Sequence, residues 1–79
     1  MRLDKYLKVS RLIKRRTVAN EACDTGRVSI NGKTAKASAK VSPGDVIEIV
    51  FGTRTVKAEV LSVAETVRKE EAQELFRYL

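Results

Sequence analysis

The sequence predicts an α+β fold in which two N-terminal helices pack on a small, mostly antiparallel sheet of three to five short strands. Two observations support this prediction. Apolar residues recur at helical spacing in the first part of the chain, and they alternate with polar residues after Gly26. In addition, 79 residues leave room for one small domain with a thin core.

The two helices are expected at residues 2–10 and 14–24. One face of the first helix is apolar and is formed by Leu3, Tyr6 and Leu7. The second helix has a narrower apolar stripe formed by Val18, Ala19, Ala22 and Cys23. Gly26 follows where a helix stop belongs. We interpret Tyr6 and Cys23 as core residues, since a lone cysteine in a chain without histidine has no catalytic partner.

The strands are expected after Gly26. Residues 28–30 alternate in polarity and run into Asn31-Gly32, a strong signal for a tight turn. Residues 33–40 are polar, small and basic, and indicate a short strand or a loop. Residues 46–51 form the most regular strand pattern, and residues 56–60 alternate again after a Gly-Thr-Arg turn.

Helical spacing returns near Ala64, and the apolar positions that show it are Val67, Ala72, Leu75, Phe76 and Leu79. We therefore expect an acidic C-terminal helix that lies away from the basic face. This pattern divides the chain into a domain at residues 1–63 and a helical tail at residues 64–79.

The charge of the chain is strongly polarised. The first forty residues contain eleven basic and three acidic side chains, about +8, whereas residues 41–79 contain five basic and seven acidic ones, about −2. A field aimed from one half of a small protein favours docking of a polyanion, and nucleic acid is the usual one.

Composition disfavours several other classes of protein. The chain has no histidine, no tryptophan and one cysteine, which argues against a metal site, a cofactor, a Ser–His or Cys–His catalytic site and a disulfide framework. No apolar run approaches the length of a membrane span or of a signal peptide. We expect a cytoplasmic binding protein that is not an enzyme and does not contact membranes.

The candidate RNA-binding residues begin with Lys14, Arg15 and Arg16, at the start of the second helix. Cations there oppose the helix dipole and cost about 0.3–1 kcal/mol each, so a purely structural role is hard to sustain. A bound phosphate would satisfy both the free backbone N–H groups and the guanidinium groups.

Three basic residues of the first helix extend this surface into a strip: Arg2, Lys5 and Lys8. For Arg27 and Lys33 two interpretations stay open: each contacts an RNA backbone, or each is an ordinary surface charge. Asp4 is interpreted as a structural acid that pairs with Lys8, or alternatively as a residue that orients Arg2. Only four aromatic residues are present, so recognition should rest on shape and phosphate instead of base stacking.

The order of four short motifs resembles a known family. Arg2-Leu3-Asp4, Arg16, residues 26–33 (GRVSINGK) and residues 43–48 (PGDVIE) stand at the spacing found in the S-four RNA-binding domain, which contains the αL motif. The resemblance covers residues 1–50. A stand-alone copy with a short tail is similar to the fifteen-kilodalton heat-shock proteins and to the small ribosome-associated quality-control proteins of Gram-positive bacteria, the RqcP family.

The resemblance implies binding to ribosomal RNA and tRNA on large ribosomal subunits that hold peptidyl-tRNA after a stalled ribosome has split. The protein partner that it implies is the factor that adds a C-terminal alanine tail to the stalled chain. We expect a monomer, with Arg2 and Arg16 at the RNA surface. The family usually places Ser or Thr before the arginine of the second helix. Arg15 stands there in this chain, so a cap on that helix is expected to be missing or shifted.

The alternative function is a helix-turn-helix-like DNA-binding module. The exposed face of the second helix would then enter the major groove, but it offers Asn20, Glu21 and Asp24, and the two acids would be repelled by phosphates. Binding to a membrane surface is weaker still, because the core needs the apolar face of the first helix.

Overall fold

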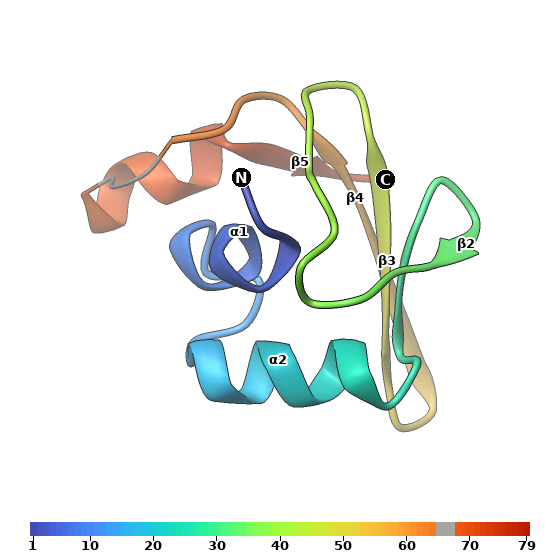
Figure 1. Ribbon diagram of the computed structural model, residues 1–79. Helices are drawn as coiled ribbons and strands as arrows, with labels where there is room; N and C mark the ends of the chain where they lie inside the picture. The colour runs from blue at the N-terminus through green and yellow to red at the C-terminus, as the bar shows by residue number, and fades with distance from the viewer. Residues whose placement is uncertain (65–67) are drawn as a thin grey trace.

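The computed structural model describes residues 1–64 and 68–79, and it has two layers, with two helices on one face of a five-stranded sheet (Figure 1). The strand order is β2-β1-β3-β4-β5, and every neighbouring pair is antiparallel. The elements are α1 (Leu3–Val9), α2 (Arg16–Asp24), β1 (Val28–Ile30), β2 (Lys33–Thr34), β3 (Val46–Phe51), β4 (Arg54–Val60), a 3-10 helix η1 (Lys69–Glu74) and β5 (Phe76–Tyr78). The predicted fold class, two helices on a small antiparallel sheet, is confirmed.

The core lies between the helices and the sheet. α1 buries Leu3, Tyr6 and Leu7 completely, as its apolar face predicts. α2 buries the small side chains of its stripe, among them Cys23, so the interpretation of Tyr6 and Cys23 as core residues is confirmed. Val18 is the exception, since it is about half exposed.

The central pair of strands follows the predicted alternation. Ile47 and Ile49 of β3 face the helices and are buried, and Ile47 lies opposite Ala58 of β4. Glu48 lies opposite Lys57, and the two side chains form an ion pair of 3.5 Å. One face of the sheet therefore contributes to the core, while the other carries charged pairs across neighbouring strands.

The Asn31-Gly32 turn forms as its sequence predicts. Both residues have positive φ, 52° and 83°, which suits the two-residue turns that join antiparallel strands. The Asn31 side chain also holds the turn to β3: its amide donates to Asp45 at 3.1 Å, and its oxygen accepts the Val46 N–H at 2.9 Å. The turn residues thus fix where β1 and β3 meet.

The expected C-terminal helix is not what forms. Residues 69–74 make a 3-10 helix, and residues 76–78 pair with β4 as the fifth strand. Three of the apolar positions that suggested a helix are buried, namely Ala72, Leu75 and Phe76, whereas Leu79 is exposed and Val67 lies outside the described residues. The spacing therefore marked three positions that reach the core but not the conformation of the segment, because a short apolar run fits a strand as well as a helix turn. The division at residue 64 stays a prediction.

The ends of the two N-terminal helices agree with the expected ones to within one or two residues. The largest difference is at the start of α2, which begins at Arg16 and not at Lys14. Within the described residues, no helix is long and apolar enough to cross a membrane.

Candidate nucleic-acid interface

The carboxylate of Asp4 is the centre of a charged cluster that joins the two helices. Asp4 lies in the first turn of α1 with a side chain only 3% exposed. Arg2 donates to both carboxylate oxygens, from Nε at 3.1 Å and from Nη2 at 3.3 Å. From α2, Asn20 donates at 3.2 Å, and Arg16 Nε lies at 3.5 Å. The Lys5 backbone N–H completes the set at 2.8 Å.

Both arginines of this cluster, Arg2 and Arg16, remain open to solvent on their other side. Their side chains are 51% and 49% exposed. Arg16 approaches Asp4 through Nε, so its two terminal nitrogens are left for another partner. A guanidinium group has five N–H donors in a planar fork, and the free edge of that fork matches a phosphate.

The environment of Asp4 keeps it ionised. Burial by itself raises the pKa of this carboxyl group. The hydrogen bonds from Arg2, Asn20 and the Lys5 N–H, together with the charge of Arg16, outweigh burial and hold the pKa below its ordinary value. The expected pairing of Asp4 with Lys8 is not what the structure shows: the partners of the Asp4 carboxylate are Arg2 and Arg16, and the contact with Arg2 agrees with the alternative interpretation, in which Asp4 orients that arginine.

The start of α2 continues the cluster. Arg15 occupies the position before the helix, and its side chain makes no capping hydrogen bond, so the missing cap is confirmed. Lys14 and Arg15 are exposed, and no acidic residue lies in the first turn of the helix. A hollow of about 310 Å³ is lined here by Asp4, Arg16, Thr17 and Asn20. Free backbone N–H groups and cations at one helix start form an anion-binding arrangement.

The remaining predicted residues are placed less centrally. Lys5 and Lys8 lie on α1, half-buried and exposed, respectively. Arg27 follows the other end of α2, and that end, Asp24, lies about 12 Å along the helix from Arg16 at 1.5 Å per residue. Lys33 lies in β2 at the edge of the sheet (Figure 1). The structure therefore gathers Arg2, Lys14, Arg15 and Arg16, and it sets Arg27 and Lys33 apart.

Two residues that sequence reasoning did not place in the interface lie beside Arg2 and Arg16. Asn20 binds the carboxylate that both arginines share. Lys40 is exposed and pairs with Arg2 through an isolated antiparallel bridge. The basic composition of residues 33–40 was a signal for Lys40, but the bridge to the N-terminus is a long-range contact that no local pattern predicts.

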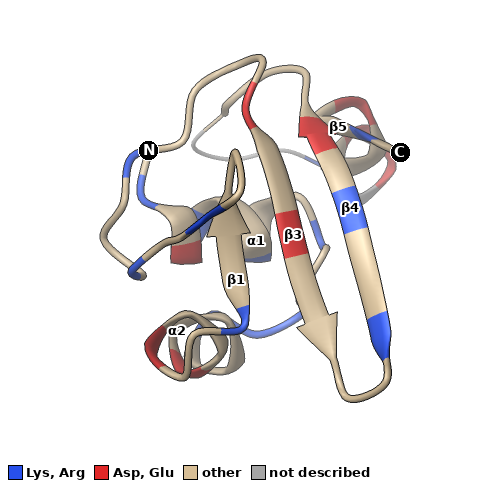
Figure 2. Ribbon diagram, turned by 90° about the vertical axis from the view of Figure 1, so that its right-hand side faces the viewer, with Lys and Arg blue, Asp and Glu red and all other residues tan. Residues whose placement is uncertain are grey.

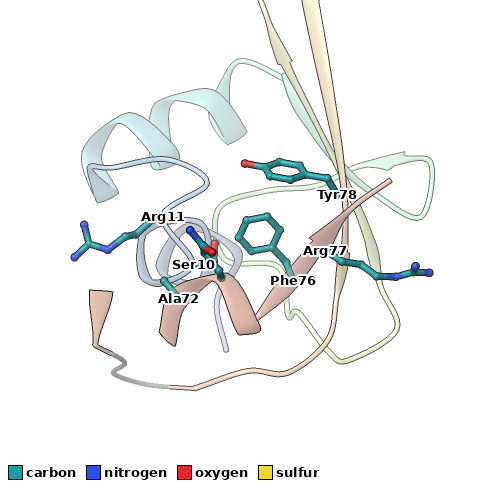
Figure 3. A pocket seen from close by; sticks show the side chains of 7 residues that line it. Ser10, Arg11, Ala72, Phe76, Arg77 and Tyr78 are labelled. Carbon is teal, nitrogen blue, oxygen red and sulfur yellow. The ribbon is translucent and has the colours of Figure 1, made fainter. Parts of the chain in front are cut away.

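A second hollow, of about 460 Å³, lies between the end of α1 and the C-terminal segment. Figure 3 shows the Phe76 ring beside Ser10 and the Tyr78 ring next to Phe76, while Arg11 and Arg77 point away on opposite sides. Arg77 is held by Glu59 at 2.6 Å. The acidic η1 borders this hollow, which makes it less suited to a polyanion than the start of α2.

The basic N-terminal half and the acidic C-terminal half of the chain lie on different sides of the structure. Figure 2 shows the N-terminal segment with its basic residues on one side and the acidic 3-10 helix beside the C-terminus on the other. A polyanion that approaches this protein is therefore guided towards the N-terminal half.

The chain is similar in sequence to a known domain family and to several curated proteins. Residues 1–47 match the family model described as the S4 domain. Two similar relatives are both named RQC P-site tRNA stabilizing factor. The one from Halalkalibacterium halodurans is 58% identical over 76 residues, which cover 96% of this chain and 86% of the relative. The one from Bacillus subtilis is 54% identical over 79 residues, which cover 100% and 92%, respectively.

A solved structure of heat shock protein 15 from Vibrio cholerae, described as trimeric, has the same fold. It superposes with a TM-score of 0.92 at 32% identity, and the match covers 100% of this chain and 81% of that protein.

Proposed function

The chain belongs to the S4 domain family, and from this premise we propose that it binds RNA in ribosome-associated quality control. Its ligands in this proposal are ribosomal RNA and tRNA on large ribosomal subunits obstructed by peptidyl-tRNA. There it supports the factor that adds C-terminal alanine tails to stalled chains. The names of the two similar relatives, which refer to a P-site tRNA, support the choice of tRNA as one ligand.

The observation that carries the proposal is the pair formed by Arg2, just before α1, and Arg16, the first residue of α2. Both guanidinium groups contact one buried carboxylate, and both are half exposed. Next to them lie the exposed cations Lys14 and Arg15 and a helix start without a side-chain cap. Phosphate oxygens suit these donors better than water does, since phosphate is itself negatively charged and can accept two parallel N–H bonds from one guanidinium group.

Recognition through shape and phosphate fits the positions of the aromatic rings. Tyr6 is fully buried and Phe76 is nearly so, so neither presents a face for stacking. The exposed rings, Phe51 and Tyr78, lie in the C-terminal half. Structured RNA is commonly recognised through its backbone and groove shape, without stacking on unpaired bases.

The alternative of a DNA-binding module receives less support. The free donors gather at the start of α2, whereas its exposed face carries Glu21 and Asp24. A recognition helix in the major groove needs donors along that face.

We propose a binding protein and not an enzyme. Cys23 is buried, and burial raises the pKa of its thiol to about 11, which keeps it protonated. Within residues 1–64 and 68–79, no group of three or more acidic or cysteine side chains is arranged to hold a metal ion.

We also propose that the chain works as a monomer in the cytoplasm. Both edges of the sheet are short, two residues in β2 and three in β5, which limits pairing with a second copy. The formal net charge of +6 further opposes self-association. Sedimentation equilibrium should give one chain per particle, and a trimer like the one described for the Vibrio protein would contradict this.

Sedimentation with ribosomal particles tests the proposed function. The wild-type chain should migrate with large subunits that carry peptidyl-tRNA, and Arg16→Ala and Arg2→Ala should each weaken this association by about 1–3 kcal/mol. Arg54→Ala is a matched control, because it removes an exposed arginine from the other half of the chain. The circular dichroism spectrum should stay unchanged in all three variants.

Two results would contradict the proposal. Absence of the wild-type chain from large-subunit fractions would exclude the ribosomal ligand. If Arg16→Ala, Arg2→Ala and Arg54→Ala all sedimented like the wild type, the ligand would remain but the interface would be wrong. In an organism with alanine tailing, the two interface variants should also lower tail synthesis.

A further inference from the structure

We propose that Asp4 is a positioning residue for RNA binding: it holds Arg2 and Arg16 in one fixed arrangement before the RNA arrives. This inference rests on the proposed function, because it assigns how the two arginines are prepared for their ligand. Asp4 itself is buried and contacts no RNA in this account.

The geometry of the cluster supports this role. A single carboxylate receives hydrogen bonds or charge contacts from both arginines, at 3.1 and 3.5 Å, although Arg2 precedes α1 and Arg16 is the first residue of α2. Arg16 contacts Asp4 through Nε, and Arg2 does so through Nε and Nη2, so each guanidinium group keeps terminal N–H donors that Asp4 does not bind. Asn20 and the Lys5 N–H fix the carboxylate in turn. The cluster therefore orders both the acceptor and the donors.

The charge balance of the cluster supports the same role. Two guanidinium groups that contact one carboxylate lie close enough to repel each other, and Asp4 offsets this repulsion. A free arginine side chain must also lose rotamer freedom when it binds, and a side chain that is already ordered loses less. The negative charge of Asp4 lowers the affinity for RNA through repulsion. In this proposal, the order that Asp4 gives to the two arginines raises the affinity by more than this repulsion lowers it.

Long-range charge and the positioning role therefore predict opposite effects of Asp4→Asn on RNA affinity. Asp4→Asn raises the formal net charge from +6 to +7, so long-range attraction alone predicts tighter RNA binding. The positioning role predicts weaker binding, by about tenfold, because two arginines must then be ordered during association.

Glu21→Gln is the matched control. It makes the same change of charge in the same half of the chain, at an exposed position of α2. We expect this variant to bind RNA as tightly as the wild type or slightly more tightly. Asp4→Asn should bind about tenfold more weakly than Glu21→Gln.

The experiment is a fluorescence-anisotropy titration with large-subunit ribosomal RNA across a salt series, using folded protein verified by circular dichroism. The slope of log K against log salt should change by less than about 1 in Asp4→Asn, since both arginines still reach phosphates and lose only their order before binding. In a background that already contains Arg2→Ala and Arg16→Ala, Asp4→Asn should cause almost no further loss.

Other results would overturn the proposal. Asp4→Asn binding as tightly as Glu21→Gln would show that long-range charge is the only effect. An equal loss in the double-arginine background would assign Asp4 a purely structural role. If Arg16→Ala weakened binding and Asp4→Asn did not, only this inference would fail. If the wild type bound no RNA, the proposed function would fail with it.

A measurement on the free wild-type protein covers the case in which Asp4→Asn does not fold. Nitrogen relaxation of the arginine Nε–H groups should show that Arg2 and Arg16 are ordered, in contrast to the exposed Arg15 on the adjoining loop. Equal mobility of all three groups would overturn the proposal without any variant.

Discussion

Single residues determine how the charged cluster responds to pH. Because the pKa of Asp4 is held below its usual value, the folded state gains stability from the ionised carboxylate above about pH 4. That gain is lost as the pH falls through the lowered pKa, when the carboxyl group takes up a proton and its arginine partners lose their counter-charge.

Comparison of the wild type with Asp4→Asn isolates this effect, since all other carboxylates titrate in both proteins. The stability advantage of the wild type should be constant near neutral pH and should shrink below about pH 4. Urea unfolding followed by circular dichroism from pH 7 to pH 2 measures it. An advantage that stays constant across this range would show that Asp4 has the same pKa in the folded and unfolded states.

At the scale of the elements, the residues at the start of α2 lower the stability of the helix and are the same residues that we propose to bind phosphate. Arg15 precedes the helix without capping it, and cations surround the positive end of the dipole. Arg15→Ser supplies a capping oxygen and removes a cation, so it should stabilise the protein by about 1 kcal/mol.

The same variant should weaken RNA binding, because a candidate phosphate ligand is lost. Lys14→Ser serves as the control: it removes a cation one residue earlier, where a serine does not cap, and it should stabilise less. Denaturant unfolding and RNA titration of both variants give the comparison. If Arg15→Ser stabilised the protein and left RNA affinity intact, Arg15 would not belong to the interface.

The C-terminal segment is a second element with a measurable contribution. The Tyr6 hydroxyl donates to the Leu75 carbonyl at 2.6 Å and so ties α1 to the residues before β5. Burial raises the pKa of this hydroxyl, which keeps it a donor. The Leu75 carbonyl also accepts the N–H groups of Leu61 at 2.8 Å and Ser62 at 3.2 Å.

Tyr6→Phe should therefore cost only about 1 kcal/mol of stability, since the acceptor keeps other partners. Equilibrium unfolding in urea tests this value. A loss above about 3 kcal/mol would mean that the hydroxyl organises more of the C-terminal segment than this one contact.

For the whole molecule, the separation of charge predicts how RNA binding depends on salt. The N-terminal half carries about +8 and the C-terminal half about −2, and the cations of the interface belong to the former. Release of counterions from RNA should make log K fall steeply and linearly with log salt, with a slope that becomes less negative by about 1 in Arg16→Ala. A titration series in potassium chloride measures both slopes. Affinity that does not change with salt would exclude phosphate contacts as the main source of binding.

Much of this protein follows from local patterns in its sequence. Apolar spacing places α1 and α2, alternation places β3, and Asn31-Gly32 specifies a turn with two positive φ angles. The absence of a cap at Arg15 is also visible in the sequence. These features depend on neighbours within a few residues, so a linear pattern contains the information that they need.

Long-range contacts decided the rest. The apolar positions of the tail specify burial, but only pairing with β4 makes residues 76–78 a strand and not a helix. In the same way, the sequence marks Arg2 and Arg16 as candidates and allows the local contact of Arg2 with Asp4, whereas the packing of α1 against α2 brings Arg16 and Asn20 to the same carboxylate. The physical reason is common to both cases. A hydrogen-bond partner that lies dozens of residues away, or on another helix, is determined by how the core packs. The periodicity of a single segment does not predict that packing.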